Sequence, residues 1–179
     1  MNEPQKRERR SSLDFQSDVL GRVPVRIGDV KVAEGSSVLF TIGLGSCVAV
    51  ALYDAEKKIG GLAHAMLPHP HNGRGDAPAG RFAVTAVPEL IQRMEAQGAS
   101  VKRLGARLAG GASMFRDVLD GEGLRLGRRN VDAAREALHA AGVPVDGEDV
   151  FGTYGRSVFL RTTDGRLLVT SVKHDDVLL

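Results

Sequence analysis

Residues 41–54, T-I-G-L-G-S-C-V-A-V-A-L-Y-D, contain the only cysteine among the 179 residues of this chain and change character at that residue. Before Cys47 lie Gly43, Gly45 and Ser46, which allow the backbone to turn sharply and to approach a ligand closely. After it, apolar residues at 48, 50 and 52 follow the pattern of a buried strand. The stretch therefore predicts a thiol at a loop-to-strand junction, where the strand holds it rigidly and the loop leaves it accessible.

A second apolar run, residues 59–67, follows this strand after the charged turn D-A-E-K-K. The connection is so short that the two runs are predicted to form an antiparallel hairpin. If the hairpin turns near Glu56, residue 65 lies opposite Cys47. The neighbouring His64 would then come within reach of the thiol.

The remaining chain alternates strand and helix patterns without internal repeats. The predicted strands are 23–33, as one strand or a pair broken at Gly28-Asp29, then 38–41, 104–109, 143–145, 157–161 and 167–172. Two helices are predicted, one within 81–97, where Pro88 requires a kink or a place in the first turn, and one from a cap at Asn130 to Gly142. These elements predict an α+β layered sandwich with mostly antiparallel sheets and two main helices.

The composition indicates one ordinary globular domain. With 42% hydrophobic residues the chain can close its own core, so residues 18–179 are expected to form a single domain after a disordered or loosely held tail at 1–17. A single cysteine cannot form an internal disulfide, and no apolar run approaches the roughly 20 residues of a membrane helix. The expected location is therefore a reducing cytoplasm, without membrane insertion. A net charge of +2 with 4% aromatic residues disfavours nucleic-acid binding.

The residues around the hairpin include each group that a thiol hydrolase needs. Cys47 is the only thiol, His64 can exchange a proton near neutral pH, and the hydroxyl or carbonyl of Thr41 can orient the imidazole. Backbone N–H groups around Gly45 and Ser46 can stabilise an oxyanion. The alternative is structural: a cysteine can be a small buried hydrophobe, and a histidine on an apolar strand can be a satisfied core residue.

Two further patterns are weaker. His64, His69, His71 and Asp76 form a candidate zinc set, but the H-P-H spacing lies in a loop that supplies no helical or paired-strand geometry to fix the ligands. The interpretation is therefore that no metal is bound. Residues 101–130 are locally basic, which is typical of a solvated surface and can also steer an acidic protein partner.

Five motifs follow one another along the chain, in order and without a large gap. They are T-I-G-L-G-S-C-V-A-V-A-L-Y-D, G-G-L-A-H-A-M-L-P, A-G-G-A-S-M-F, L-G-R-R-N-V and Y-G-R-S-V. Taken together they resemble the successive blocks of the CheD family, the chemoreceptor glutamine deamidases of bacterial chemotaxis. The resemblance covers roughly residues 23–172, and its first two blocks are highly specific. One departure is Phe151, where the family pattern D-x-G-G-x-x-G-R has glycine.

This resemblance implies an α/β sandwich related to the catalytic core of cytotoxic necrotizing factor toxins, with a Cys-His-Thr triad at Cys47, His64 and Thr41. It implies hydrolysis of glutamine side chains to glutamate on methyl-accepting chemotaxis receptors, with release of ammonia and without a metal or organic cofactor. It also suggests a complex with the phosphatase CheC and some methylesterase activity on receptor glutamates. Two alternatives stay open: a non-catalytic adaptor that binds receptors or CheC, and a metal-bound hydrolase.

Overall fold

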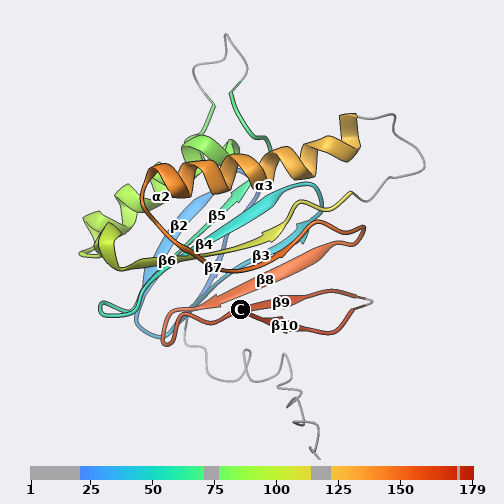
Figure 1. The fold of residues 1–179 in the computed structure, drawn as a ribbon. Helices are drawn as coiled ribbons and strands as arrows, with labels where there is room; N and C mark the ends of the chain where they lie inside the picture. The colour runs from blue at the N-terminus through green and yellow to red at the C-terminus, as the bar shows by residue number, and fades with distance from the viewer. Residues whose placement is uncertain (1–20, 71–76, 114–121, 173) are drawn as a thin grey trace, which may run out of the picture.

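The computed structural model describes residues 21–70, 77–113, 122–172 and 174–179, and the expected tail at 1–17 lies outside these ranges. The described chain forms two five-stranded sheets and two α-helices (Figure 1). The first sheet has the order β1 (Gly21–Pro24), β3 (Ser37–Leu44), β8 (Arg156–Arg161), β9 (Leu167–Thr170) and β10 (Val177–Leu178). The second has the order β2 (Val30–Glu34), β5 (Ile59–Ala65), β4 (Val48–Asp54), β6 (Leu104–Gly110) and β7 (Val145–Val150).

The helices α2 (Ala83–Ala96) and α3 (Glu122–Ala140) cover the outer face of the second sheet (Figure 1). Short 3-10 turns, η1 (Ala79–Arg81) and η2 (Val101–Arg103), precede α2 and β6. Among the described strands, β1 pairs with β3 and β6 with β7 in parallel, and the other pairings are antiparallel. The prediction of an α+β sandwich with mostly antiparallel sheets and two main helices is therefore confirmed. No described helix is long and apolar enough to cross a bilayer.

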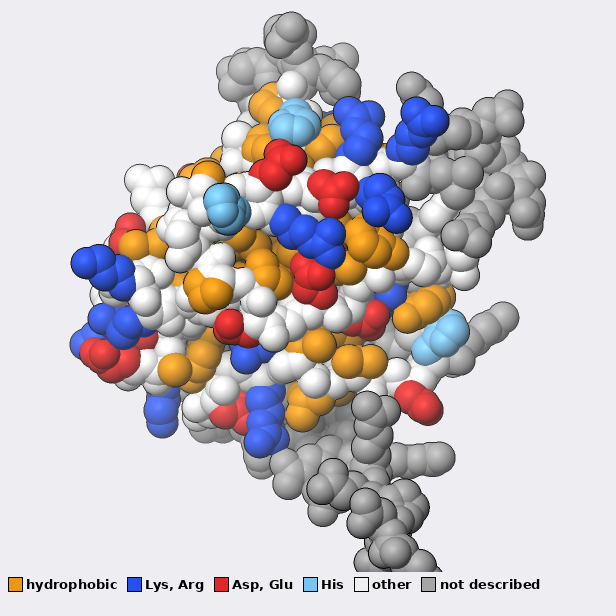
Figure 2. All heavy atoms as spheres, in the orientation of Figure 1, with side chains coloured by type: hydrophobic (Ala, Val, Ile, Leu, Met, Phe, Trp, Pro, Cys, Tyr) orange, Lys and Arg blue, Asp and Glu red, His pale blue; other side chains and the backbone are white. Residues whose placement is uncertain are grey.

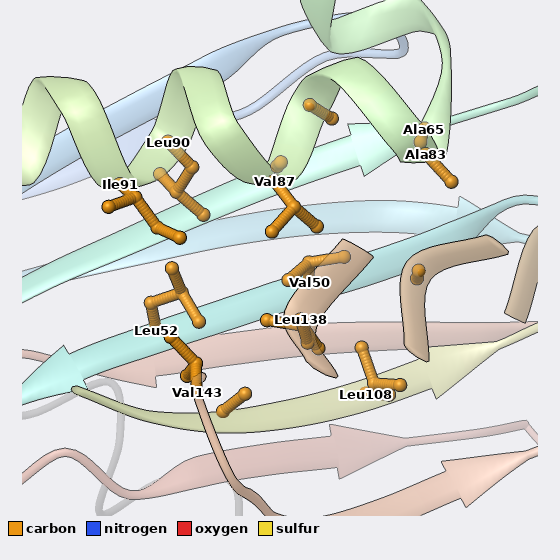
Figure 3. Close-up of a cluster of buried hydrophobic side chains, with 14 of the residues drawn as sticks. Val50, Leu52, Ala65, Ala83, Val87, Leu90, Ile91, Leu108, Leu138 and Val143 are labelled. Atoms are coloured by element: carbon orange, nitrogen blue, oxygen red, sulfur yellow. The ribbon is translucent and has the colours of Figure 1, made fainter. Parts of the chain in front are cut away.

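Strand β4 lies in the middle of the second sheet and is buried along its whole length. Its larger residues, Val48, Val50 and Leu52, pack with both helices. Figure 3 shows Val50 and Leu52 among the helix residues. Its small residues, Ala49 and Ala51, face the first sheet and pack into the layer between the two sheets. The V-A-V-A-L alternation thus suits a strand that is buried on both faces. The small side chains on one face let the two sheets approach, and the larger ones on the other face contact the helices.

The predicted hairpin of β4 and β5 is present, with its pairing shifted by one residue. Val48 lies opposite Ala65, and Ala49 lies opposite His64. In this register the position opposite Cys47 is Met66 rather than residue 65. Because side chains alternate between faces along a strand, His64 shares a face with Ala49. That face is the one turned toward the first sheet.

Helix α2 contains Pro88 in its interior, so of the two alternatives predicted, a place in the first turn is wrong. The helix begins at Ala83, whose N–H donates to the Leu67 carbonyl, and it continues through the proline without the bond that the missing N–H would make. The buried face of α2 offsets the cost of that proline, which is about 3 kcal/mol in a helix interior. That face includes Val87 and Leu90.

Asn130 does not cap a helix, which corrects a second expectation. Helix α3 already begins at Glu122, so Asn130 lies inside it and its side chain is fully buried. The start of α3 is hard to read from sequence because Gly127 interrupts its apolar face, and this glycine packs directly against backbone. The run 23–33 forms the strands β1 and β2, separated around Gly28-Asp29 as one of the two alternatives predicted, and the short strand β10 was not predicted.

Candidate active site

Thr41 and His64 connect the two sheets where β3 and β5 end. Thr41 Oγ1 lies 2.7 Å from His64 Nδ1, a hydrogen bond between a residue of the first sheet and a residue of the second. Both side chains are buried, with 2% of Thr41 and none of His64 exposed. The hydroxyl, rather than the carbonyl, of Thr41 therefore meets the imidazole, and it sets the orientation of the ring.

The backbone of His64 is held by the loop between β1 and β2. The His64 carbonyl accepts from Gly28 N at 2.8 Å, and His64 N donates to the Asp29 carbonyl at 3.1 Å. The N–H and carbonyl of His64 therefore point away from β4, so His64 and the facing Ala49 form a non-hydrogen-bonded pair of the antiparallel ladder. In such pairs the facing side chains lie closest. The loop 26–29 thus fixes the height of the imidazole in the layer between the sheets.

The second imidazole nitrogen, His64 Nε2, is buried and has no hydrogen-bond partner among the described residues. Cys47 lies one residue before β4, two positions from Ala49, and packs against the apolar cluster between the sheets. This register makes Cys47 a diagonal neighbour of His64, a separation that long side chains can bridge. A buried polar atom without a partner in a native core calls for an explanation, such as a catalytic role or a bound substrate.

The loop that carries Cys47 is tied back by its carbonyl groups. The Gly45 carbonyl accepts from Ala112 N at 2.8 Å, and the Cys47 carbonyl accepts from Gly111 N at 2.7 Å. Between them, the Ser46 carbonyl accepts from Asn130 Nδ2 at 2.8 Å. No hydrogen bond to another described residue uses the N–H groups of this loop. The loop therefore has a fixed backbone with its donors left available.

Burial shifts both titrating groups of the site toward their neutral forms. Loss of solvation raises the pKa of the Cys47 thiol, and the residue's own backbone N–H partly opposes this. Loss of solvation also lowers the pKa of His64 from 6.5 to about 4, and the negative charge of Asp29 partly opposes that shift. At neutral pH the resting site therefore holds a thiol and a neutral imidazole rather than an ion pair.

The low pKa of His64 predicts a loss of stability in mild acid. Between pH 6.5 and 4 the unfolded chain binds a proton at His64 that the folded protein does not, so the free energy of unfolding falls as the pH falls. The interval between the two pKa values corresponds to about 3 kcal/mol, measurable by urea unfolding at pH 7.0 and 4.5. His64→Gln should lack this part of the pH dependence. A variant with the same slope as the wild type would contradict the assignment.

The candidate zinc set is not assembled in the part of the chain that the structure describes. His71 and Asp76 lie outside the described residues, His64 is engaged with Thr41, and His69 is exposed on the loop after β5. Within the described residues, no group of three or more histidine, cysteine or acidic side chains has an arrangement that could hold a metal ion.

The basic residues of segment 101–130 that the structure describes do not gather on one surface. Arg103 binds Asp54 at the far end of β4, with Nη2 2.7 Å from Oδ2, and holds the pKa of that carboxyl at about 2. The arginines at 125, 128 and 129 lie on α3 instead. Figure 2 shows Lys and Arg side chains gathered over one part of α3, with acidic side chains among them.

Phe151, a departure from the family pattern, has a backbone conformation that favours glycine. Its φ of 69° lies in the left-handed region, which costs a non-glycine residue about 1 kcal/mol. Its N–H donates to the Gly110 carbonyl, and its own carbonyl accepts from the buried Arg156. The ring lies against the guanidinium groups of Arg128 at 4.9 Å and Arg135 at 5.4 Å, which favours the aromatic side chain at this position.

Sequence reasoning missed three contacts of the site: the clamp by Asn130, the support of His64 by the loop 26–29, and the bonds from the G-G-A turn to the cysteine loop. The A-G-G-A and R-R-N-V blocks were visible as motifs. Their contact with the cysteine loop could not be read from spacing, because the residues involved are far apart in the chain.

The described chain is a layered α+β domain with a half-buried cysteine on a hydrogen-bonded loop and a buried histidine bonded to a threonine hydroxyl. A family model described as CheD chemotactic sensory transduction matches residues 66–171. The chain belongs to the CheD family.

Curated relatives support this membership over most of their length. A Caldanaerobacter subterraneus protein is 42% identical over 150 residues, which are 84% of this chain and 93% of the relative. An Archaeoglobus fulgidus protein is 45% identical over 145 residues, 81% of this chain and 90% of the relative. Both are named probable chemoreceptor glutamine deamidase CheD. A Thermotoga maritima protein, named chemoreceptor glutamine deamidase CheD, is 42% identical over 83% of this chain and 90% of its own.

Two solved structures show weaker likeness. The hypothetical protein YfiH of Bacillus licheniformis has a TM-score of 0.42 and 16% identity, covering 70% of this chain and 51% of its own. A Neisseria meningitidis protein of the DUF152 family has a TM-score of 0.47 and 13% identity, covering 79% of this chain and 66% of its own.

Proposed function

We propose that this protein hydrolyses the side-chain amide of specific glutamines on methyl-accepting chemotaxis receptors to glutamate, with release of ammonia, by means of Cys47, His64 and Thr41. The names of its relatives supply the reaction and the class of substrate. The observation that carries the mechanism is the hydrogen bond between Thr41 Oγ1 and His64 Nδ1, together with the buried Nε2, which has no partner among the described residues and lies on the face shared with Ala49. We place the reaction in the cytoplasm, on the cytoplasmic helices of the receptors.

The neutral resting state supports a general-base mechanism. In the imidazole tautomer with hydrogen on Nδ1, that hydrogen is donated to Thr41 Oγ1, and the lone pair of Nε2 is left to accept a proton. The thiol proton of Cys47 passes to Nε2 as the sulfur attacks the carboxamide carbon of glutamine. Charge separation then arises only when substrate is in place, because burial disfavours both charged forms beforehand.

The remaining steps return every group to its starting form. The attack makes a carbon–sulfur bond and places negative charge on the carboxamide oxygen. The Nε2 hydrogen moves to the departing nitrogen, the carbon–nitrogen bond breaks, and ammonia leaves a thioester. Water then attacks the thioester carbon and gives a proton to Nε2, which passes it to the leaving sulfur. The products are glutamate and the free enzyme, so no cofactor enters.

Donors for the oxyanion are proposed at Gly45, Ser46 and Cys47. The Gly45 carbonyl, which shares a peptide group with Ser46 N–H, accepts from Ala112, and the Ser46 carbonyl, which shares one with Cys47 N–H, accepts from Asn130. These two peptide planes therefore cannot rotate freely. Their N–H groups make no hydrogen bond to another described residue. Preorganised donors of this kind stabilise a developing negative charge without reorganising during the reaction.

Thr41→Val is expected to lower kcat by about 10- to 100-fold, because the isosteric side chain keeps the packing and removes the group that orients the ring. Thr41→Ser keeps the hydroxyl and should retain most of the activity. Ammonia release from a receptor cytoplasmic fragment measures both variants. If Thr41→Val released ammonia as fast as the wild type, Thr41 would have no role in the mechanism.

The reaction itself is tested by mass spectrometry of receptor peptides after incubation with the protein. Conversion of defined glutamines to glutamate, with a matching yield of ammonia, is the expected result and also identifies the sites. Receptor peptides that remain unchanged while receptor binding is retained would instead favour the second candidate.

The second candidate is a non-catalytic adaptor that binds receptors or the phosphatase CheC. The raised pKa of the Cys47 thiol favours it, since little thiolate is present at neutral pH. As an adaptor, the protein would keep full signalling function in cells with Cys47→Ala. Charge reversal at Arg128 or Arg129, which lie on α3, would remove that function.

A further inference from the structure

Asn130 is a fully buried polar residue in the middle of α3 that contacts two distant parts of the chain. Its Nδ2 donates to the Ser46 carbonyl at 2.8 Å and to the Met66 carbonyl at 3.1 Å. Both acceptors are backbone oxygens, so the amide nitrogen must face them, and the two hydrogens of the NH₂ group are both used. Its Oδ1 is buried and has no partner within the described residues.

The two carbonyl groups belong to the two halves of the proposed site. The Ser46 carbonyl is part of the peptide group whose N–H is that of Cys47. Met66 directly follows β5, two residues beyond His64. One side chain of α3 therefore binds both the loop that carries Cys47 and the residue that follows the strand of His64. It thereby fixes the distance between them.

The approach of α3 to this loop is fixed by two glycines. A β-carbon at Gly127 would overlap the Gly111 carbonyl, and one at Gly111 would press on the Gly127 carbonyl and on Val131. Backbone therefore packs directly on backbone at this point. Residues three apart share a helix face, so Asn130 follows Gly127 on the face turned toward the cysteine loop.

We propose that Asn130 is a positioning residue of this site: it holds the Ser46–Cys47 peptide and the end of β5 in the relative geometry that the reaction needs, and it strengthens the Cys47 N–H as a hydrogen-bond donor. A hydrogen bond to the carbonyl end of a peptide polarises the group and makes its N–H a better donor. The Cys47 N–H lies beside its own sulfur and is among the proposed oxyanion donors. The proposal rests on the proposed function, because it assigns Asn130 a part in that reaction.

Two substitutions separate donation from space filling. Asn130→Asp keeps the shape but turns acceptor oxygens toward two carbonyl groups, and Asn130→Ala removes the side chain. If Asn130 acts as a donor, both variants lose kcat by about 10- to 100-fold, aspartate at least as much as alanine, with KM within about threefold of wild type. If it only fills space, the isosteric aspartate stays near wild type. Rates are taken per folded molecule, with folding followed by circular dichroism at the assay temperature.

Tyr53→Phe is the matched control. It removes another buried hydrogen bond, from the tyrosine hydroxyl to the Thr162 carbonyl at 3.0 Å, from the opposite end of β4. It should lower the melting temperature and leave kcat and KM unchanged. If Tyr53→Phe lowered kcat as much as the Asn130 variants do, the loss of kcat would reflect lower stability of the fold in general, and the proposal would be overturned.

The rate at which iodoacetamide alkylates Cys47 gives a readout that needs no receptor. Loss of the polarised N–H should slow alkylation of Asn130→Ala by about threefold or more, since the thiolate is less well stabilised. Simple loosening of the loop would expose the sulfur and speed the reaction, which would overturn the proposal. If wild-type protein releases no ammonia, the proposed function fails, and this measurement still decides the role of Asn130.

A measurement on the unaltered protein covers the case in which neither variant folds. The side-chain amide hydrogens of Asn130 should exchange with solvent at least about 100-fold more slowly than those of a free asparagine, because both lie in buried hydrogen bonds. Exchange of either hydrogen at nearly the free rate would show that the clamp is absent in solution.

Discussion

Cys47→Ala is expected to abolish the release of ammonia from a receptor cytoplasmic fragment, with a loss of at least about 10⁴-fold in kcat. The chain contains no second thiol that could replace the nucleophile. The substitution keeps the β-carbon of a half-buried residue at the edge of the cluster between the sheets, so the variant should fold and melt close to wild type. Ammonia release and peptide mass spectrometry, run on the same samples, measure the result.

Ser100→Ala is a suitable control for this experiment. It also removes a small side-chain group near β4, but at the end of that strand where Asp54 accepts a bond from the Ser100 backbone. Its activity should equal that of the wild type. A Cys47→Ala protein that kept a tenth or more of wild-type activity would end the thiol mechanism and direct attention to the adaptor alternative.

His64→Gln is expected to lower kcat by about 10³-fold while leaving Cys47 in place. Glutamine can fill much of the imidazole site and can meet Thr41, but it can neither accept the thiol proton nor return it to the leaving nitrogen. The fold should survive at neutral pH, and the protein should lose the acid-induced fall in stability described above. Single-turnover kinetics with a receptor fragment would show slow formation of the thioester rather than slow binding.

His139→Gln provides the matched control, because His139 is exposed in the last turn of α3. It should behave as wild type in both activity and acid stability. Alkylation with iodoacetamide should still label His64→Gln at Cys47 and should leave Cys47→Ala unlabelled. Full activity of His64→Gln would mean that another base accepts the thiol proton and that the buried imidazole is only structural.

The two variants test different properties of one site. In the proposed mechanism Cys47 supplies the attacking sulfur, so no other residue of the chain can replace it. His64 moves protons within a resting site that is uncharged at neutral pH, because burial disfavours both thiolate and imidazolium. If His64 acts as the proposed base, substitution of this residue should change catalysis and acid stability together, because burial lowers its pKa.

The sequence by itself determined the core strand and the hairpin. The alternation after Cys47 predicts β4, and the short charged turn predicts its antiparallel partner with His64 near the start of β4. These features are local, since strand periodicity and a short connection depend only on neighbouring residues. The motif blocks also identified the family, because several specific blocks in a fixed order constrain one another.

Only the tertiary structure decided which contacts hold the residues of the site together. The pairing register of the hairpin was shifted by one residue from the expectation, and the Thr41 hydroxyl rather than its carbonyl meets His64. Asn130 was expected to cap a helix and instead bridges the cysteine loop and the end of β5. These contacts join residues brought together by packing of two sheets and a helix, and their geometry follows from side-chain volume and backbone approach across layers rather than from any pattern along the chain.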